Sequence, residues 1–233
     1  MSVSELNAPA QDYLKLIWSA TEWSDRAITV GAMAERLGVT ASTVSDGLRK
    51  LTQQGLVSHA PYGSIELTET GRRYALVMVR RHRLLETFLV NVLGYGWDEV
   101  HAEAEVLEHA VSDLLIDRIE EHLGYPDRDP HGDLIPTREG HQPRISAWQL
   151  SECEAGSELS IVRISDASPD MLRYFSGLGL SPGTHLRLEA QHPYADVTSV
   201  CVLPSEQAID LGSAAARAIW VVGHTTEPTP PAK

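Results

Sequence analysis

The spacing of hydrophobic side chains predicts a helical first half of the chain and a β-rich second half. Apolar residues recur at helical intervals in three early stretches, residues 10–21, 28–37 and 41–54. Thr40 provides an N-cap for the third stretch. Two shorter stretches, 56–59 and 64–68, alternate like strands around a turn at Tyr62-Gly63. Helix, short turn, helix and hairpin together predict a winged helix-turn-helix over residues 1–75.

Further helices are expected over residues 69–92, 100–112 and 114–123. Gly94 ends the first of these, while Gly124 and Pro126 end the last. Long apolar helices beside a sparse core indicate a dimer interface. Residues 76–126 are therefore expected to form a helical dimerisation domain that makes the chain a homodimer.

The second half of the chain begins with a run rich in Pro, Gly, Asp and His, which predicts a linker over residues 127–147. His131 and His141 within it are expected to be solvated. Four short strands follow, at residues 159–165, 184–190, 197–203 and 218–222, and predict a small β-barrel domain over 148–226. The tail, 227–233, is Pro-rich and expected to be disordered. The fold class is thus mainly α with a small β domain.

Charge and composition limit the class of protein. The formal net charge of −13 argues against a nucleic-acid partner, but residues 1–75 carry 7 Lys and Arg against 8 Asp and Glu, a net of only −1. No apolar run approaches the ~18 residues of a membrane span, and the first residues lack a leader pattern. We therefore expect a cytoplasmic protein without a membrane partner. Its two distant cysteines are expected to stay reduced.

Residues that can bind metal gather in the stretch Val100–Ser112. On a helix, His101, Glu105, Glu108 and His109 would lie within about a third of the circumference, on an otherwise apolar element. Two crowded carboxylates repel and are costly to bury without a partner, and a divalent cation removes both problems. The alternative is a solvated acidic helix face.

Other candidate ligands have simpler explanations of their own. His82 and Glu86 stand four residues apart and point the same way on a helix, although such a pair is more often a surface hydrogen bond. Asp12 lies in the first turn of a helix, where it could simply favour the positive end of the helix dipole.

The third predicted helix leaves a polar face for DNA. Thr40, Ser42, Thr43 and Asp46 are expected near the groove of a double-stranded operator, with Arg49 and Lys50 on phosphates. A carboxylate such as Asp46 can accept a hydrogen bond from a cytosine amino group but repels phosphate. A small helical core of this kind that does not contact DNA is the alternative.

A winged helix-turn-helix followed by R-R-H-R-L-L-E-T (Arg80–Thr87) and V-H-A-E-A-E-V-L-E-H (Val100–His109) resembles the diphtheria toxin repressor family of metal-activated repressors. The resemblance implies an SH3-like third domain and two metal sites per subunit. The primary site would use Asp12, Glu105, Glu108 and His109. The ancillary site would use His82, Glu86 and His101, completed by a polar group of the third domain, where Asp166 or Asp170 could serve.

Two departures from the family pattern bear on the metal. In the iron-responsive members that the chain resembles, Met and Cys stand at the positions of Asp12 and Glu105. This chain has two carboxylates there, and such hard oxygen ligands favour Mn²⁺ over Fe²⁺. Manganese-sensing members with two domains carry a Glu three residues after the Asp. Lys15 stands there in this chain and cannot coordinate a cation while protonated, which predicts two separated sites instead of a close metal pair.

Three functions follow from these observations. The first is a Mn²⁺-activated transcriptional repressor that controls metal homeostasis genes by binding a palindromic operator as a dimer. The second is an iron-responsive or broadly divalent regulator of the same build. The third is a metallohydrolase, which would need an open coordination position and a nearby base. The sequence has no H-E-x-x-H motif, nucleophile elbow or phosphate loop, so we expect no enzyme.

Overall fold

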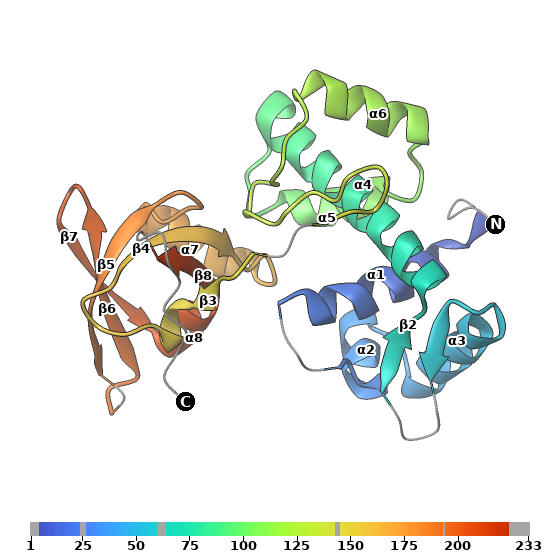
Figure 1. The fold of residues 1–233 in the computed structure, drawn as a ribbon, viewed down its shortest axis with the longest axis horizontal. Helices are drawn as coiled ribbons and strands as arrows, with labels where there is room; N and C mark the ends of the chain where they lie inside the picture. Colours follow the sequence, from blue (N-terminus) through green and yellow to red (C-terminus); the bar gives the residue numbers. More distant parts are fainter. Residues whose placement is uncertain (1–4, 24–26, 60–63, 143–144, 193, 224–233) are drawn as a thin grey trace. The chain divides into compact units, whose positions relative to one another are not determined.

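A computed structural model describes residues 5–23, 27–59, 64–142, 145–192 and 194–223 (Figure 1). The chain forms two compact units. The first consists of Met1–His82, Glu108–Ser112 and Pro136–Gln142, and the second of Arg83–Leu107, Asp113–Ile135 and Pro143–Lys233. The predicted turn at Tyr62-Gly63 and the predicted tail, 227–233, lie outside the described residues.

The first unit contains the predicted winged helix-turn-helix. Its elements are α1 (Ala8–Glu22), α2 (Val30–Leu37), α3 (Ala41–Gln53), β1 (Val57–His59), β2 (Ile65–Leu67) and the beginning of α4 (Glu69–Leu93). The two strands are antiparallel, with Val57 opposite Leu67. As predicted, the Thr40 side chain caps α3, accepting from the N–H of Thr43 at 3.2 Å. Gly38 ends α2 in the left-handed conformation, φ 64°, which an L side chain rarely adopts.

The core of the first unit joins its helices. Leu14 and Ile17 of α1, Met33 of α2, and Val44 and Leu48 of α3 are almost completely buried. The predicted period-3.6 apolar positions are thus the positions that pack inward. The Tyr13 hydroxyl also donates to the main-chain oxygen of Thr43 at 3.4 Å. Helix α1 therefore contacts the N-terminal half of α3 by both packing and hydrogen bonding.

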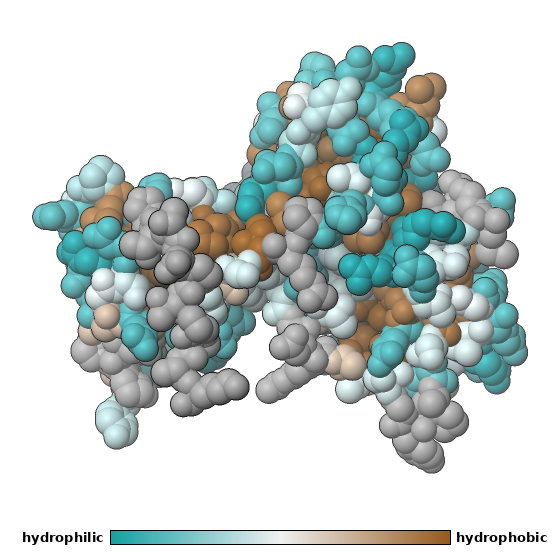
Figure 2. Space-filling view, viewed as in Figure 1, coloured by the Kyte–Doolittle hydropathy of each residue, from teal (hydrophilic) through white to brown (hydrophobic). Residues whose placement is uncertain are grey.

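The helical part of the second unit comprises the rest of α4, α5 (Val100–Leu107) and α6 (Asp113–His122). The single helix predicted over residues 100–112 is wrong at its C-terminal end, because Glu108, His109 and Ala110 form a turn. Figure 2 shows apolar side chains among the polar ones at the surface of this part. The large exposed ones are Val92, Leu93, Val106, Leu114 and Leu115.

The remainder of the second unit is a six-stranded antiparallel sheet with two short helices. Its strands are β3 (Trp148–Gln149), β4 (Glu158–Ile164), β5 (His185–His192), β6 (Val197–Leu203), β7 (Gln207–Gly212) and β8 (Ile219–Gly223). A 3-10 turn (Leu150–Glu152), α7 (Pro169–Leu178) and α8 (Ser213–Arg217) complete it. The strand order is β3-β8-β4-β5-β6-β7. In the described residues the edge strands β3 and β7 do not pair with each other, so the sheet of the predicted small β domain is open and is not closed into a barrel.

The core of the sheet is continuous with α7. Phe175 of α7 is completely buried together with Ile164, Leu186 and Val200 from three strands. The alternation of buried and exposed residues along β4, β6 and β7 follows the period of two expected of a sheet with one buried face. Across the described residues, we find no helix with the length and apolar character that a membrane span requires.

Candidate metal centres

Glu108 begins the turn that follows α5 and is completely buried in the first unit. Its Oε1 atom lies 2.6 Å from the Lys15 ammonium of α1, and its Oε2 atom lies 2.6 Å from Nδ1 of His82 on α4. Burial by itself would raise the pKa of Glu108, but the hydrogen bond and charge of His82 and the charge of Lys15 outweigh it and lower the pKa. Glu108 is therefore a buried carboxylate with Lys15 on one side and His82 on the other.

Three candidate ligands meet beside Lys15, and we call Asp12, Glu108 and His109 the Asp12 cluster. Nε2 of His109 lies 2.9 Å from Asp12 Oδ1 and 3.7 Å from Glu108 Oε1. The side chains of Asp12 and His109 are partly exposed, at 35% and 22%. A carboxylate of α1 and an imidazole of the turn thus face each other at a position that solvent can reach.

Gln11 orients the histidine of the Asp12 cluster and is not among the predicted site residues. Its amide nitrogen donates to the main-chain oxygen of Leu6 at 2.9 Å, so its Oε1 atom is left to accept from Nδ1 of His109 at 2.8 Å. This bond puts a proton on Nδ1 and, in the neutral imidazole, leaves the lone pair of Nε2 directed at Asp12. Metal-bound histidines have this second hydrogen bond as a rule.

A second group of candidate ligands lies in the second unit, and we call Glu86, His101, His131 and Asp166 the Glu86 cluster. Glu86 of α4 is 1% exposed, and its Oε1 atom lies 3.1 Å from Nδ1 of His101 on α5. The same ring nitrogen lies 3.3 Å from Oδ2 of Asp166, which follows β4. Glu86, His131 and Asp166 can each offer one donor atom to a common position.

His131 is completely buried, so the expectation that it is solvated is wrong. Its Nε2 atom donates to the main-chain oxygen of Trp97 at 2.7 Å, which leaves Nδ1 to carry the lone pair of the neutral ring. Nδ1 has no hydrogen-bond partner among the described residues and lies 3.8 Å from Glu86 Oε2. A cation between this buried ring nitrogen and the buried carboxylate would give both groups a partner.

A tight turn presents His131 to the Glu86 cluster. The Oδ1 atom of Asp129 accepts from the N–H groups of His131 and Asp133, both at 2.9 Å. Asp133 in turn accepts from Arg163 of β4 at 2.7 Å. Gly132 has φ 93° and approaches β4 so closely that a Cβ would lie 2.1 Å from the main-chain oxygen of Val162. The predicted linker is at this point an ordered turn against the sheet.

The electrostatics of the Glu86 cluster favour a cation. Burial alone would lower the pKa of His101, but the carboxylates of Glu105, Glu86 and Asp166 raise it to about 10. The pKa of His131 is also about 10, because the nearby carboxylates of Glu86, Asp129 and Asp166 outweigh the effect of its burial. The negative charge of this cluster is thus large enough to hold two protons at neutral pH.

Three other predicted ligands, Glu105, His82 and Asp170, make further contacts of their own. Glu105 is half exposed, and its carboxylate lies 3.6 Å from Nε2 of His101 on the same helix. His82, expected in the ancillary site, lies one helical turn before Glu86 and bonds Glu108 of the Asp12 cluster. Asp170 is 91% exposed and contacts Arg173, so the Glu86 cluster uses Asp166 of the two candidates.

The polar residues predicted on the third helix do form an exposed face of α3. Ser42, Thr43, Asp46, Arg49 and Lys50 are all exposed, as is the capping residue Thr40. The Thr40 hydroxyl bonds those of Ser42 and Thr43 at 2.8 and 2.9 Å. Arg49 donates to Asp46 at 2.9 Å in an ion pair whose side chains are about two-thirds exposed, so solvent screens it.

The donor atoms of both clusters fit a hard or borderline divalent cation. Carboxylate oxygen and imidazole nitrogen are the ligands that such ions take, and Nδ1 of His131 is a buried ligand atom with no hydrogen-bond partner among the described residues. When bound, a cation would neutralise the carboxylates that His and Lys side chains balance in this structure.

Family models match three successive segments of the chain. Residues 5–65 match the iron dependent repressor N-terminal DNA binding domain, residues 68–137 its metal binding and dimerisation domain, and residues 148–222 the FeoA domain. The iron-dependent repressor IdeR of Mycobacterium tuberculosis is 31% identical over 231 residues, covering 94% of this chain and 99% of that protein. The diphtheria toxin repressor of Corynebacterium diphtheriae is 35% identical over 124 residues, 53% of this chain and 54% of that protein.

A solved structure described as a manganese-dependent transcriptional repressor in complex with manganese is 56% identical, with a TM-score of 0.88. The matched part spans 92% of this chain and 99% of the chain in that structure. Together, the winged helix, the helical dimerisation domain and the clustered ligands define a metal-dependent transcriptional repressor that binds DNA. The chain belongs to the diphtheria toxin repressor family of iron-dependent repressors.

Proposed function

We propose that this chain is a Mn²⁺-activated repressor with two separate metal sites per subunit, which binds a palindromic operator as a homodimer. The observation that carries the proposal is the 2.9 Å approach of Asp12 Oδ1 to His109 Nε2. Asp12 belongs to α1 of the DNA-binding fold, and His109 to the turn that follows α5. The same two atoms would hold a cation and so fix α1 against that turn.

The chain couples this site to α3 through neighbouring residues of α1. Asp12 is directed at His109, while Tyr13, the next residue, is buried against α3 and donates to Thr43. A displacement of α1 at Asp12 would therefore also displace the contact that supports α3. Metal binding selects one arrangement of α1, and the differential affinity needed for such a switch is a few kcal/mol.

Lys15 supports a single metal ion in the Asp12 cluster. Its ammonium group already lies 2.6 Å from Glu108 in a largely buried ion pair, and a second cation at that position would face this positive charge. The Asp12 cluster and the Glu86 cluster are then the two sites. Asp12, Glu108 and His109 would hold the first ion, with Glu105 as the predicted fourth ligand, and Glu86, His101, His131 and Asp166 the second.

The choice of manganese rests on the ligand atoms. Both clusters offer carboxylate oxygen and imidazole nitrogen, and hard oxygen donors suit Mn²⁺ better than thioether or thiolate sulfur does. The manganese complex that is 56% identical to this chain supports the same choice. Iron or a broader set of divalent ions is the second candidate, because IdeR of Mycobacterium tuberculosis is described as iron-dependent.

For DNA, we propose that Thr40, Ser42, Thr43 and Asp46 face the groove and that Arg49 and Lys50 contact phosphates. In a dimer, the two α3 helices would enter successive major grooves about 34 Å apart, which requires a palindromic operator. The genes controlled would be those of metal homeostasis, and the protein would act in the cytoplasm. No group of the two clusters is assigned a catalytic role.

The test compares the wild type with Asp12→Asn, which keeps the size of the side chain but removes its charge. Both proteins are first shown to be folded and dimeric by circular dichroism and sedimentation. They are then titrated with Mn²⁺, Fe²⁺ or chelator in a gel shift against the protein's own promoter region. We expect Asp12→Asn to lose most metal-stimulated binding.

Asp210→Asn is a matched control, because Asp210 is exposed on β7 and contacts Ser199 outside both clusters. It should respond to Mn²⁺ like the wild type. An Asp12→Asn protein that responds like the wild type would show that α1 is not the switch. A response to Fe²⁺ that equals or exceeds the response to Mn²⁺ would instead favour the second candidate metal.

A further inference from the structure

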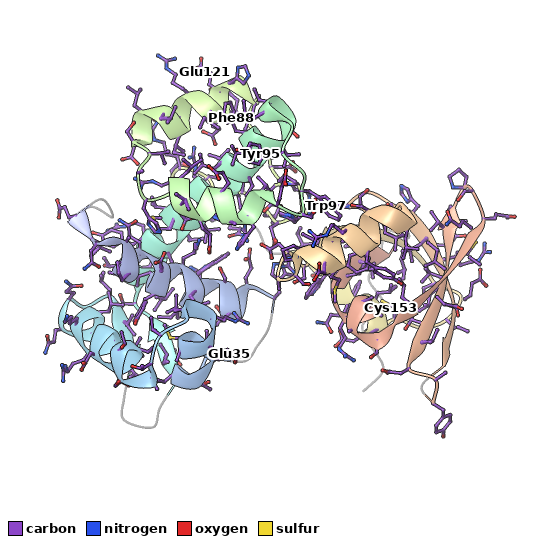
Figure 3. The ribbon with its side chains drawn as sticks, turned by 180° about the vertical axis from the view of Figure 1, so that it is seen from behind. Glu35, Phe88, Tyr95, Trp97, Glu121 and Cys153 are labelled. Atoms are coloured by element: carbon purple, nitrogen blue, oxygen red, sulfur yellow. The ribbon has the colours of Figure 1, made fainter. Side chains whose placement is uncertain are left out.

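We propose that Trp97 is a positioning residue for the Glu86 cluster, through which α7 sets the metal affinity of that cluster. The inference rests on the proposed function, since it concerns the second of the two metal sites. Trp97 lies in the loop between α4 and α5, residues 94–99, and is not itself a ligand (Figure 3). Its side chain and its main chain both contact His131, and its side chain also bonds Ser176 of α7.

The first contact fixes His131. The rings of Trp97 and His131 stack, with centroids 5.8 Å apart and planes 21° from parallel. The main-chain oxygen of Trp97 accepts from His131 Nε2 at 2.7 Å. This hydrogen bond therefore keeps the proton of the neutral ring on Nε2. The stacked indole fixes the plane of the imidazole ring and so the direction of Nδ1 towards Glu86. Both the tautomer and the orientation of His131 depend on where Trp97 stands.

The second contact fixes Trp97 itself. Its indole Nε1 donates to the hydroxyl of Ser176 on α7 at 2.6 Å. The next residue, Asp98, accepts from Arg173 on the same helix at 3.0 Å. Two neighbouring residues of the 94–99 loop are thus bonded to one face of α7, at positions three residues apart. The loop, and with it the oxygen that faces His131, is held by α7.

These contacts are connected in series, from Ser176 through Trp97 and His131 to the Glu86 carboxylate. Hydrogen bonds to the second nitrogen of a metal-bound histidine raise metal affinity, and their loss commonly costs tenfold or more. The Ser176 bond acts one step further from the ligand and is exposed, so a smaller effect is expected. We expect its removal to weaken metal binding at the Glu86 cluster about fivefold and to leave the Asp12 cluster unchanged.

The experiment counts Mn²⁺ ions bound to the metal-free full chain from the electron paramagnetic resonance signal of the free ion. Wild type should show two classes of site. Asp12→Asn should remove one class and His131→Ala the other, which assigns each class to its cluster. A wild-type chain without two classes would overturn the proposed function. Two classes with no weakening in the Trp97 variant would overturn the inference alone.

Trp97→Phe removes the indole donor but keeps an aromatic ring against His131. It should weaken only the class that His131→Ala removes. Trp148→Phe is the matched control, because Trp148 lies in β3 and contacts neither cluster in the described residues. A weakening of both classes by Trp97→Phe, or an equal effect of Trp148→Phe, would show a general loss of structure and overturn the assignment.

Ser176 provides a second pair of variants that leaves Trp97 in place. Ser176→Ala removes the acceptor for the indole and should weaken the same class of site about fivefold. Ser176→Thr keeps a hydroxyl at that position and should bind Mn²⁺ within twofold of the wild type. Equal binding by the two Ser176 variants would overturn the role of the Trp97–Ser176 bond.

Discussion

Gly47 of α3 lies directly against the ring of Tyr13 on α1: a Cβ at position 47 would be 2.4 Å from Tyr13 Cε2. Glycine in the middle of a helix normally costs about 0.5–1 kcal/mol relative to alanine. Here it allows the two helices to approach, one residue along α1 from the proposed ligand Asp12. The close contact between α1 and α3 therefore requires a residue without a side chain at position 47.

We predict that Gly47→Ala lowers the free energy of unfolding, by about 1–3 kcal/mol, because the added methyl group must displace the Tyr13 ring or α3. Urea denaturation of the metal-free protein measures the change. The same variant should also weaken Mn²⁺-stimulated DNA binding, because α3 can no longer take its position against α1.

Gly31→Ala is the control for this substitution. Gly31 lies in α2, and a Cβ there would have only an ordinary contact, 3.9 Å from Thr29 Oγ1. It should leave the stability unchanged or raise it by up to about 1 kcal/mol, as helix propensity requires. Equal effects of the two alanines would show that the Tyr13 contact is not tight.

A second prediction concerns Arg49, which is paired with Asp46 in the free protein. Arg49→Ala should weaken binding to all DNA sequences alike and lower the slope of affinity against salt by about one unit, because a phosphate contact is lost. Fluorescence anisotropy across a salt series measures both quantities. A loss confined to the operator sequence would place Arg49 on a base, and Asp46→Ala should show just that sequence-dependent loss.

A third prediction concerns metal preference. Asp12→Met with Glu105→Cys should shift activation from Mn²⁺ towards Fe²⁺, because sulfur ligands suit the softer ion. The two single variants separate the contributions, which matters because Glu105 is half exposed and contacts His101. The measurement is an anaerobic gel shift with each metal. Equal Mn²⁺ and Fe²⁺ responses in the wild type and all variants would contradict the explanation.

A fourth prediction is that Mn²⁺ binding releases protons. In the metal-free protein the pKa values of His101 and His131 are about 10, so both rings are charged at any pH well below 10. Metal ligation requires their neutral forms, so affinity should rise as pH increases from 6 to 8, by up to tenfold per pH unit for each proton released. Calorimetry in buffers of different ionisation enthalpy counts the protons.

His131→Gln should reduce that number by about one while leaving the Asp12 cluster able to bind. If the wild type takes up Mn²⁺ at both sites without releasing protons, the histidines of the Glu86 cluster are not ligands. The sign of the pH dependence provides a separate check, since an affinity that falls between pH 6 and 8 would be incompatible with competition between metal and protons.

Much of the first unit could be predicted because its patterns are local. The buried positions of α1 and α3 recur at helical spacing, and Thr40 marks the start of α3 by a side chain three residues from its partner. The end of α5 could not be predicted in this way. No Gly or Pro lies between Leu107 and the start of α6 at Asp113. The helix ends where Glu108 contacts Lys15, which is 93 residues away in the sequence.

For the candidate sites too, residues that are close in the sequence could be predicted, and contacts between distant residues could not. His101, Glu105, Glu108 and His109 stand out because they are close in sequence, although the structure directs them to different partners. His131 was missed because a run of Asp, Pro and Gly is typical of solvated loops. Its signal is the spacing D-x-H-x-D, in which Asp129 accepts from the N–H groups of His131 and Asp133 and so builds a turn around the histidine.

Gly132 makes that turn possible and limits how the protein can change over time. Its backbone has φ 93°, and any Cβ would collide with the main-chain oxygen of Val162. A lineage that replaced this glycine would displace His131 from Glu86 while keeping every candidate ligand in its sequence. A search for relatives that retain the second site should therefore require the glycine as well as the histidine.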